Sequence, residues 1–277
     1  DTRWSVFDMG PHGIGHQHND KLHVSIFAHG RDLLTDAGKY TYRSINDRSP
    51  RDWRGYFKRS WSHNVILVNH KSQNDEVEEV TEPVTEWKIT DLYDFALGTF
   101  DKGWDKHEGI HQRAFVNIKG KCWLICDKME LREPSNIQAL WHFHPECTVS
   151  KTQDEHVSTT DIGKGNIRIA PVVMDSSGWK VEVVKGQMDP YYQGWYSAKT
   201  NRKEPSSCAV YEAANVTTAR FAWLITTDKG KPPVYKAEIL FTGGDILKIS
   251  IDDNRGSKYI VDIDFGKKRG HVKVTNQ

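Results

Sequence analysis

The 277-residue sequence has no long apolar run, no block of like charge and few cysteines. No apolar segment reaches the roughly 20 residues of a membrane-spanning helix, so we expect no membrane insertion. The 38 basic and 37 acidic residues are spread along the chain, which argues against nucleic-acid binding. The four cysteines form no C-x-x-C pair, so we expect buried free thiols and no thiolate zinc site: Cys122, Cys126, Cys147 and Cys208.

The chain also lacks an initiating methionine and a signal peptide. It begins with Asp1, just before an apparent strand at residues 4–7. We therefore expect a processed or excised piece of a longer protein, so the absence of a targeting signal says little about location.

Aromatic residues are plentiful, whereas the hydrophobic content of 37% is low. Trp, Tyr and Phe number ten each. This mixture suits an all-β protein, because aromatic side chains favour half-buried pleated surfaces. It also suits a sugar binder, although packing is the commoner role of such residues.

Short apolar stretches separated by turn residues predict a large antiparallel β-sandwich. Residues 22–28 alternate apolar and polar, and His29 and Gly30 turn the chain into a second strand. The length fits one large β-domain or two smaller ones, and we place a soft boundary that divides the chain into 1–205 and 206–277. The last part either closes the sandwich or forms a small second β-domain. Further strands are expected at 85–89, 95–99, 113–118, 122–129, 139–143, 167–173, 180–184, 209–211, 219–226, 234–241, 246–251 and 259–265.

Two long segments lack periodicity and are predicted to be loops. The first, residues 43–60, is rich in arginine and would bind carboxylates or sulfates through forked hydrogen bonds. Its candidate substrate-binding residues are Arg51, Arg54 and the neighbouring Trp53; a solvated surface is the alternative. The second, residues 186–207, is rich in Gly, Tyr and Pro. Its residues 191–197 would form a sugar platform or, as we favour, a plug over the end of the sandwich.

The densest chemistry lies between Gly15 and Tyr42. His16 and His18 are two residues apart, so in extended chain their side chains point the same way and could share a metal ion. Asp36 and His63 are the best candidates for further ligands, a set that suits zinc. A tight hairpin around Gly30 would place Asp36 opposite Val24, so the loop at residues 16–20 must fold back to reach it. Ordinary loop histidines are the alternative.

Tyrosines near this stretch are candidate proton-transfer groups. A metal or arginine beside Tyr40 or Tyr56 could lower the phenol pKa enough for acid–base catalysis. Tyr42 is more readily explained as a strand aromatic that packs the sandwich. The second H-x-H, His142 and His144, lies in an apolar strand and is expected to be structural.

An ordered run of motifs across residues 7–73 resembles the heparinase II/III-type β-domain. It comprises Phe7-Asp8-x-Gly10-Pro11, Gly15-His16-x-His18-x-Asp20-Lys21-Leu22, Gly30-Arg31-x-Leu33-Leu34-x-Asp36-x-Gly38-x-Tyr40 and Ser62-His63-Asn64. A looser likeness reaches about residue 211. The resemblance implies a β-sandwich that follows an N-terminal α/α toroid, which this chain would lack. It also implies a mainly structural divalent metal ion, zinc before calcium or manganese, on His18, Asp36 and His63, with His16 in catalysis.

The resemblance further implies β-elimination on a uronic-acid polysaccharide, by a bacterial, periplasmic or secreted lyase of heparin or heparan sulfate. An alginate or other uronan lyase is the nearest alternative. A non-catalytic carbohydrate-binding sandwich and a metal-dependent hydrolase using His16, His18 and Asp36 come from other classes. Because the main catalytic Tyr and the carboxylate neutralisers of the family come from the toroid, we expect the isolated chain to have little or no activity.

Overall fold

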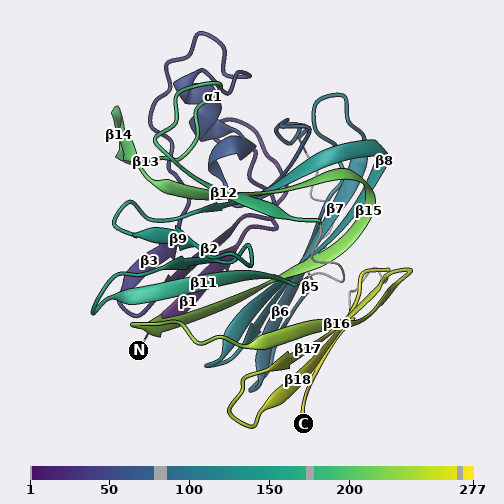
Figure 1. Ribbon diagram of the computed structural model, residues 1–277. Coiled ribbons are helices and arrows are strands. Elements are labelled where there is room, and N and C mark those ends of the chain that lie inside the picture. The colour runs from purple at the N-terminus through teal and green to yellow at the C-terminus, as the bar shows by residue number, and fades with distance from the viewer. Residues whose placement is uncertain (1, 78–85, 173–177, 267–270) are drawn as a thin grey trace.

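The computed structural model describes residues 2–77, 86–172, 178–266 and 271–277, and its regular structure is almost entirely antiparallel β (Figure 1). The predicted all-β sandwich is therefore confirmed. The predicted strand ends at Thr85 and Val173 lie outside the described residues. Within the described residues the two helices span six and three residues, and no helix is long and apolar enough to cross a membrane.

A ten-stranded sheet forms the middle of the molecule. A three-stranded sheet contains β1 (Arg3–Phe7), β2 (Val24–Ala28) and β3 (Arg31–Leu34). A four-stranded sheet contains β16 (Lys236–Gly243), β17 (Ile246–Asp252), β18 (Lys258–Asp264) and β19 (His271–Asn276). The large sheet follows the order β5 (Glu86–Ile89), β6 (Tyr93–Phe100), β7 (Gly109–Ile118), β8 (Cys122–His142), β15 (Ser207–Lys229), β11 (Gly165–Val172), β10 (Val157–Thr159) and β9 (Val149–Lys151), with β4 (Ile66–Val68) on β8 and β12 (Lys180–Lys185) on β15.

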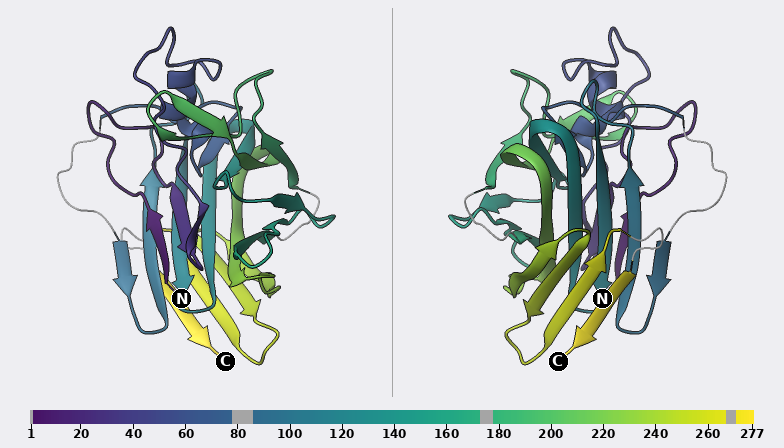
Figure 2. Two further views of the ribbon diagram at one scale, coloured as in Figure 1. Left: turned by 90° about the vertical axis from the view of Figure 1, so that its left-hand side faces the viewer. Right: turned by 90° about the vertical axis from the view of Figure 1, so that its right-hand side faces the viewer.

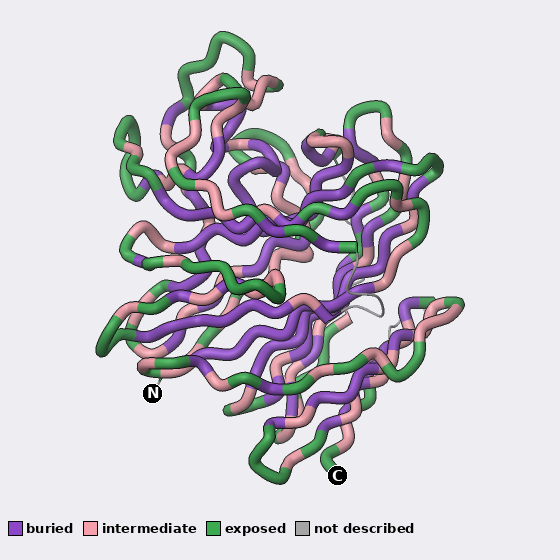
Figure 3. The backbone as a smooth tube through the Cα atoms, in the orientation of Figure 1, coloured by how far each residue is buried: buried purple, intermediate pink, exposed green. Residues whose placement is uncertain are grey.

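Side-chain alternation explains the layers, because successive residues of a strand point to opposite faces. Trp123 and Ile125 of β8 pack in one core cluster with Val24 and Ile26 of β2. The intervening Leu124 packs in a second cluster with β17 and β18. The two smaller sheets therefore lie toward opposite sides of the large sheet, and the buried stretches run through its central strands (Figures 2 and 3).

The longest strands, β8 and β15, each join two segments that the sequence predicts as separate strands. Both curve strongly near the middle (Figure 1), where their pairing shifts register between Ala213 and Thr218. Such shifts increase the bend of a strand pair. Exposed polar residues at the bend interrupt the apolar pattern of β8, which is why it appears as two strands in the sequence. The boundary predicted near residue 205 precedes β15, which lies inside the large sheet.

The arginine-rich segment is only partly the predicted surface loop. Trp53–Lys58 form helix α1, which is followed by the 3₁₀ helix η1 (Ser60–Ser62). The Asp52 side chain accepts a hydrogen bond from the backbone N–H of Gly55 and so caps α1. The helix is too short for a periodic pattern and too short to be stable alone, so packing stabilises it. Tyr56 and Phe57 supply that packing, in a cluster with Leu67, Leu140 and Cys208.

The second predicted loop also contains a hairpin, β13 (Trp195–Lys199) and β14 (Arg202–Pro205). Its strand β13 lies along residues 37–40, where the Ser197 N–H donates to the Ala37 carbonyl over 2.8 Å. The Asn201 N–H donates to the Tyr40 carbonyl over 2.7 Å. All four cysteines are free and buried, as predicted.

The close approach of β13 to Gly38 gives a stability prediction. Gly38 has a φ of +81°, and a Cβ there would collide with the Ser197 carbonyl oxygen. We expect Gly38→Ala to lower the free energy of unfolding by more than about 2 kcal/mol, because left-handed strain adds to the collision. Gly30→Ala is the control, since Gly30 has a φ of +83° but no atom near its added Cβ. Equal losses in urea unfolding would show that the contact with β13 contributes nothing.

Candidate metal-binding and catalytic site

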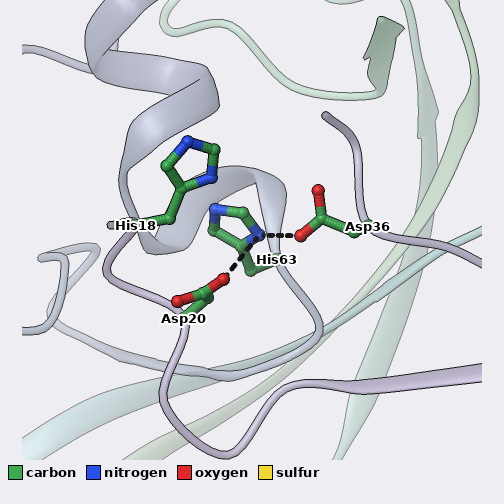
Figure 4. A group of neighbouring side chains, drawn as sticks. All are labelled: His18, Asp20, Asp36 and His63. Carbon is green, nitrogen blue, oxygen red and sulfur yellow. Dashed lines mark hydrogen bonds and ion pairs between the residues drawn. The ribbon is translucent and has the colours of Figure 1, made fainter. Parts of the chain in front are cut away.

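Four side chains converge at one end of the sandwich: His18, Asp20, Asp36 and His63 (Figure 4). One potential ligand atom from each lies within 4.8 Å of those of the other three. The His63 Nδ1–H donates to Asp36 Oδ2 over 2.7 Å, and Asp20 Oδ2 lies 4.0 Å from the same nitrogen. The His18 and His63 ring centroids are 5.2 Å apart. The structure thus brings the three predicted ligands together and adds Asp20.

The loop before β2 folds back toward Asp36, as the hairpin geometry requires. Residue 26 pairs with residue 34 across β2 and β3, so Asp36 continues the chain past the end of β3. The Asn19 N–H donates to the Lys58 carbonyl over 2.9 Å. The Leu22 N–H donates to the Asp8 carbonyl over 2.7 Å. These bonds place His18 and Asp20 between α1 and the start of the chain.

Asn64, beside His63, connects the site to the surrounding strands. Its side-chain nitrogen donates to the Val24 carbonyl over 2.8 Å, and its side-chain oxygen accepts from the His142 N–H over 2.6 Å. Its backbone N–H donates to His23 Nδ1 over 2.9 Å, so the other His23 nitrogen carries the proton that bonds Ser25 Oγ. His142 is buried here and serves structure, as its apolar strand suggests.

A buried ion pair beneath Asn64 holds this arrangement. Arg113, 1% exposed, donates through Nε to Asp127 Oδ1 over 2.7 Å. Its Nη1 donates to the Asn64 carbonyl over 2.7 Å and to the Leu22 carbonyl over 2.9 Å. Asp127 also accepts from His111 and Trp223. One guanidinium therefore fixes the backbone next to His63 and close to Asp20.

Electrostatics at the site favour a positive charge between the carboxylates. Burial lowers the pKa of His63, but Asp36 and Asp20 outweigh it and raise that pKa to about 9. Burial raises the pKa of Asp20 to about 6 against the opposing effect of His63. Burial also raises the pKa of Asp36, but His63 outweighs it and lowers that pKa below its ordinary value. Burial and the charge of His63 lower the pKa of His18 to about 3.

These residues fit a bound divalent cation. A neutral His18 leaves a ring nitrogen free to coordinate, and His63 Nδ1 faces both carboxylates, 2.7 Å from Asp36 Oδ2 and 4.0 Å from Asp20 Oδ2. Two carboxylates next to two imidazoles match the nitrogen and oxygen donor set of zinc and similar first-row metals. Asp36 is also oriented by the Gly38 N–H, which donates to its Oδ1 over 2.7 Å.

His16 lies outside this group, at the rim. Its ring packs edge-on against Tyr42 with 5.2 Å between centroids, and both residues are exposed. A surface pocket connects His16 with His12, His18 and Asp20. The two histidines of the H-x-H motif thus have different surroundings, because His18 is partly buried and joins the group around His63, whereas His16 is exposed.

The other predicted catalytic residues have different neighbours. Tyr56 is 0% exposed, and its hydroxyl accepts from the Trp195 N–H over 3.2 Å. Burial raises the pKa of Tyr56, the opposite of the lowering expected for a general base, so this phenol packs the region under α1. The Tyr40 hydroxyl is half-buried and accepts from Lys203 Nζ over 3.3 Å. That ammonium also lies 4.2 Å from the Trp53 ring centroid.

The three predicted substrate-binding residues do not face one another. Arg51 is exposed and lies 3.5 Å from Asp189. Trp53 stacks on Tyr192 at 4.0 Å between centroids, which supports packing for the 191–197 segment. Arg54 faces Tyr42, with 5.1 Å from the guanidinium carbon to the ring centroid.

Two residues of the site were missed in the sequence. Asp20 was noted as a neighbouring carboxylate but not as a member of the metal-binding group. Its spacing of two from His18 was a usable signal, since both side chains would share a face in extended chain. Tyr42 was assigned to packing, yet it is exposed beside His16. No spacing signal distinguishes an exposed tyrosine in an irregular segment from a buried one.

A family model described as heparinase II/III-like, C-terminal, matches residues 3–231, so the chain belongs to that family. A solved heparan sulfate lyase HepC from Pedobacter heparinus superposes with a TM-score of 0.69 at 16% identity, covering 98% of this chain and 39% of that one. A heparinase III gene product superposes with a TM-score of 0.72 at 14% identity, covering 99% and 39%. This chain therefore spans well under half the length of these proteins, and at such identities they show a shared fold. A search of curated protein sequences finds no match.

The site geometry predicts which variants lose a bound metal ion. We expect about one equivalent of zinc by elemental analysis, and its loss in His63→Ala and Asp36→Asn, because both remove potential ligands. His16→Ala is the matched control and keeps the metal. A tight ion also stabilises the fold, by about 2.7 kcal/mol at a hundred times its dissociation constant. Metal retained by His63→Ala, or lost by His16→Ala, would contradict the assignment.

The buried ion pair predicts a separate stability effect. We expect Arg113→Leu to lower the free energy of unfolding by about 3–5 kcal/mol, because Asp127 is left buried without its main partner. Arg132→Ala breaks the exposed pair of Arg132 with Glu108, both side chains 70% exposed, and should cost less than about 1 kcal/mol. Denaturant unfolding measures both. A cost below 1 kcal/mol for Arg113→Leu would show that the pair does not hold the core.

Proposed function

We propose that this chain is the β-domain of a polysaccharide lyase that cleaves heparin or heparan sulfate by β-elimination. The single observation that carries the proposal is the exposed His16–Tyr42 pair, set beside the converging group of His18, Asp20, Asp36 and His63. A rigid anchor behind an accessible imidazole is what a proton-transfer site needs. Family membership and the fold of heparan sulfate lyases support the choice of reaction.

In this reaction a base takes the weakly acidic C5 proton of a uronate, the C4–O4 bond breaks as a C4=C5 double bond forms, and an acid protonates the departing O4. The carboxylate must be neutralised first, which is a task for preorganised positive charge. His16 is proposed to transfer a proton in this reaction, a role to which an imidazole is well suited. The hydroxyl of Tyr40 is a second candidate for this role, held by Lys203. The product carries an unsaturated sugar at its new non-reducing end.

The metal ion, proposed to be zinc, would supply positive charge that holds His18, Asp20, Asp36 and His63 together. These four residues fix the loop that presents His16. The remaining catalytic groups are proposed to come from an N-terminal α/α toroid, and the protein is proposed to act in a bacterial periplasm or outside the cell. We expect the chain without such a partner domain to turn over little substrate.

Absorbance of the unsaturated uronate tests the proposal. The protein that carries this chain together with its α-helical domain is incubated with heparan sulfate and, separately, alginate. We expect product from heparan sulfate, and a drop in kcat of about 10²–10⁴-fold in His16→Ala through loss of proton transfer. His12→Ala, in the same loop, is the control.

Product from alginate alone would point to a different uronan. Saturated products that vanish with a chelator would point to a hydrolase. Binding without any product would favour a carbohydrate-binding module. An unchanged kcat in His16→Ala would remove this residue from the chemistry.

A further inference from the structure

Arg54 is a buried cation without a counter-charge among the residues that the structure describes. It is 7% exposed, and its Nη1 atom is buried with no hydrogen-bond partner. Its guanidinium makes a cation–π contact with the Tyr42 ring. Burying an unpaired charge costs free energy, and a neutral ring compensates for little of it.

Four other cations of the same segment have carboxylate partners. Arg59, at 5% exposure, lies 3.1 Å from Asp75, and Lys58 lies 3.4 Å from Asp47. The exposed Arg48 and Arg51 also have carboxylates within 4 Å, those of Asp75 and Asp189. Arg54 thus differs from Arg59, the other buried arginine of this segment, which has a carboxylate partner.

Two acidic residues close in sequence to Arg54 and Tyr42, Asp52 and Asp36, already have hydrogen-bond partners. Asp52 accepts from Ser44 Oγ and from backbone N–H groups that include Gly55. Asp36 accepts from His63 and Gly38. Neither carboxylate makes an ion pair with Arg54, so its charge remains available to an incoming anion.

A second cation adds to the positive character around Tyr42. Lys39 Nζ donates to the Tyr42 hydroxyl over 3.2 Å and lies 4.6 Å from the ring centroid. His16 contacts the same ring. Tyr42 therefore lies among Lys39, Arg54 and the candidate catalytic histidine.

We propose that Arg54, with the Tyr42 hydroxyl and Lys39, binds one oxyanion of the substrate, a sugar carboxylate or sulfate, next to His16. The planar guanidinium offers paired N–H donors that match either group. This proposal rests on the proposed function in one respect: the oxyanion is taken to belong to a polysaccharide substrate. The anion supplies the partner that Arg54 lacks among the described residues.

Stability and binding should therefore move in opposite directions. We expect Arg54→Met to unfold at the same or a higher temperature, because an apolar side chain of similar length removes an unpaired buried charge. The same substitution should weaken oligosaccharide binding by about 10- to 100-fold, through loss of charge-assisted hydrogen bonds. Arg48→Met, which removes an exposed arginine of the same segment, is the control and should leave binding unchanged.

The test titrates this chain with three oligosaccharides: an unsulfated uronate tetrasaccharide, a carboxyl-reduced heparin tetrasaccharide and neutral chitotetraose. Arginine side-chain NMR signals follow Arg54 in the wild type, so this readout does not depend on whether a variant folds. A shift of the Arg54 signal with the first probe identifies a carboxylate site, and with the second a sulfate site. Tyr42→Phe should weaken the same binding several-fold.

No Arg54 shift with either charged probe, an equal shift with chitotetraose, or a marked loss of stability in Arg54→Met would each overturn the anion site. Failure of the lyase proposal can be distinguished from failure of the anion site. Arg54-dependent binding without unsaturated product leaves the anion site standing, whereas product formation with an unchanged KM in Arg54→Met refutes the anion site alone.

Discussion

The buried ion pair of Arg113 and Asp127 is the interaction on which the site depends most. Arg113 belongs to the central strand β7, and it reaches both Leu22 and Asn64 through one guanidinium nitrogen. Those two residues follow the site residues Asp20 and His63 closely in the sequence. The guanidinium binds Asp127 through Nε and Nη2 while its Nη1 bonds both chain segments, which a lysine with a single nitrogen could not do in the same geometry. The core of the sandwich thereby sets the position of residues at its surface.

The His-rich segment contributes residues to two groups with different surroundings, which we call the anchor and the presented group. The anchor consists of His18, Asp20, Asp36 and His63, whose charges favour a cation. The presented group contains His16 and Tyr42, with Lys39 and Arg54 around the same ring. Hairpin β13–β14 supports the segment between these two parts by pairing with residues 37–40. The arrangement lets a rigid sandwich hold exposed groups in fixed positions at its surface.

Strand alternation, a local signal, predicted the β-sandwich, and the resemblance to the heparinase II/III-type β-domain implied three members of the anchor. The sequence did not predict helix α1, whose six residues are stabilised by contacts with β4 and β8 that no local pattern records. Tyr56 shows the same limit, since only the tertiary contacts reveal that its hydroxyl faces Trp195. The strand pattern also divided β8 and β15 at their exposed bends. The unpaired state of Arg54 depends on where every nearby carboxylate lies, which only coordinates define.

The central claim is that one half of the H-x-H motif anchors a metal ion while the other half stays free for substrate. The most direct measurement is anomalous diffraction at the zinc absorption edge from crystals of this chain grown with zinc. The account predicts one strong peak within about 2.0–2.2 Å of a His18 nitrogen, a His63 nitrogen and an aspartate oxygen, with His16 uncoordinated. A peak coordinated by His16, or no peak between Asp20 and Asp36, would contradict it.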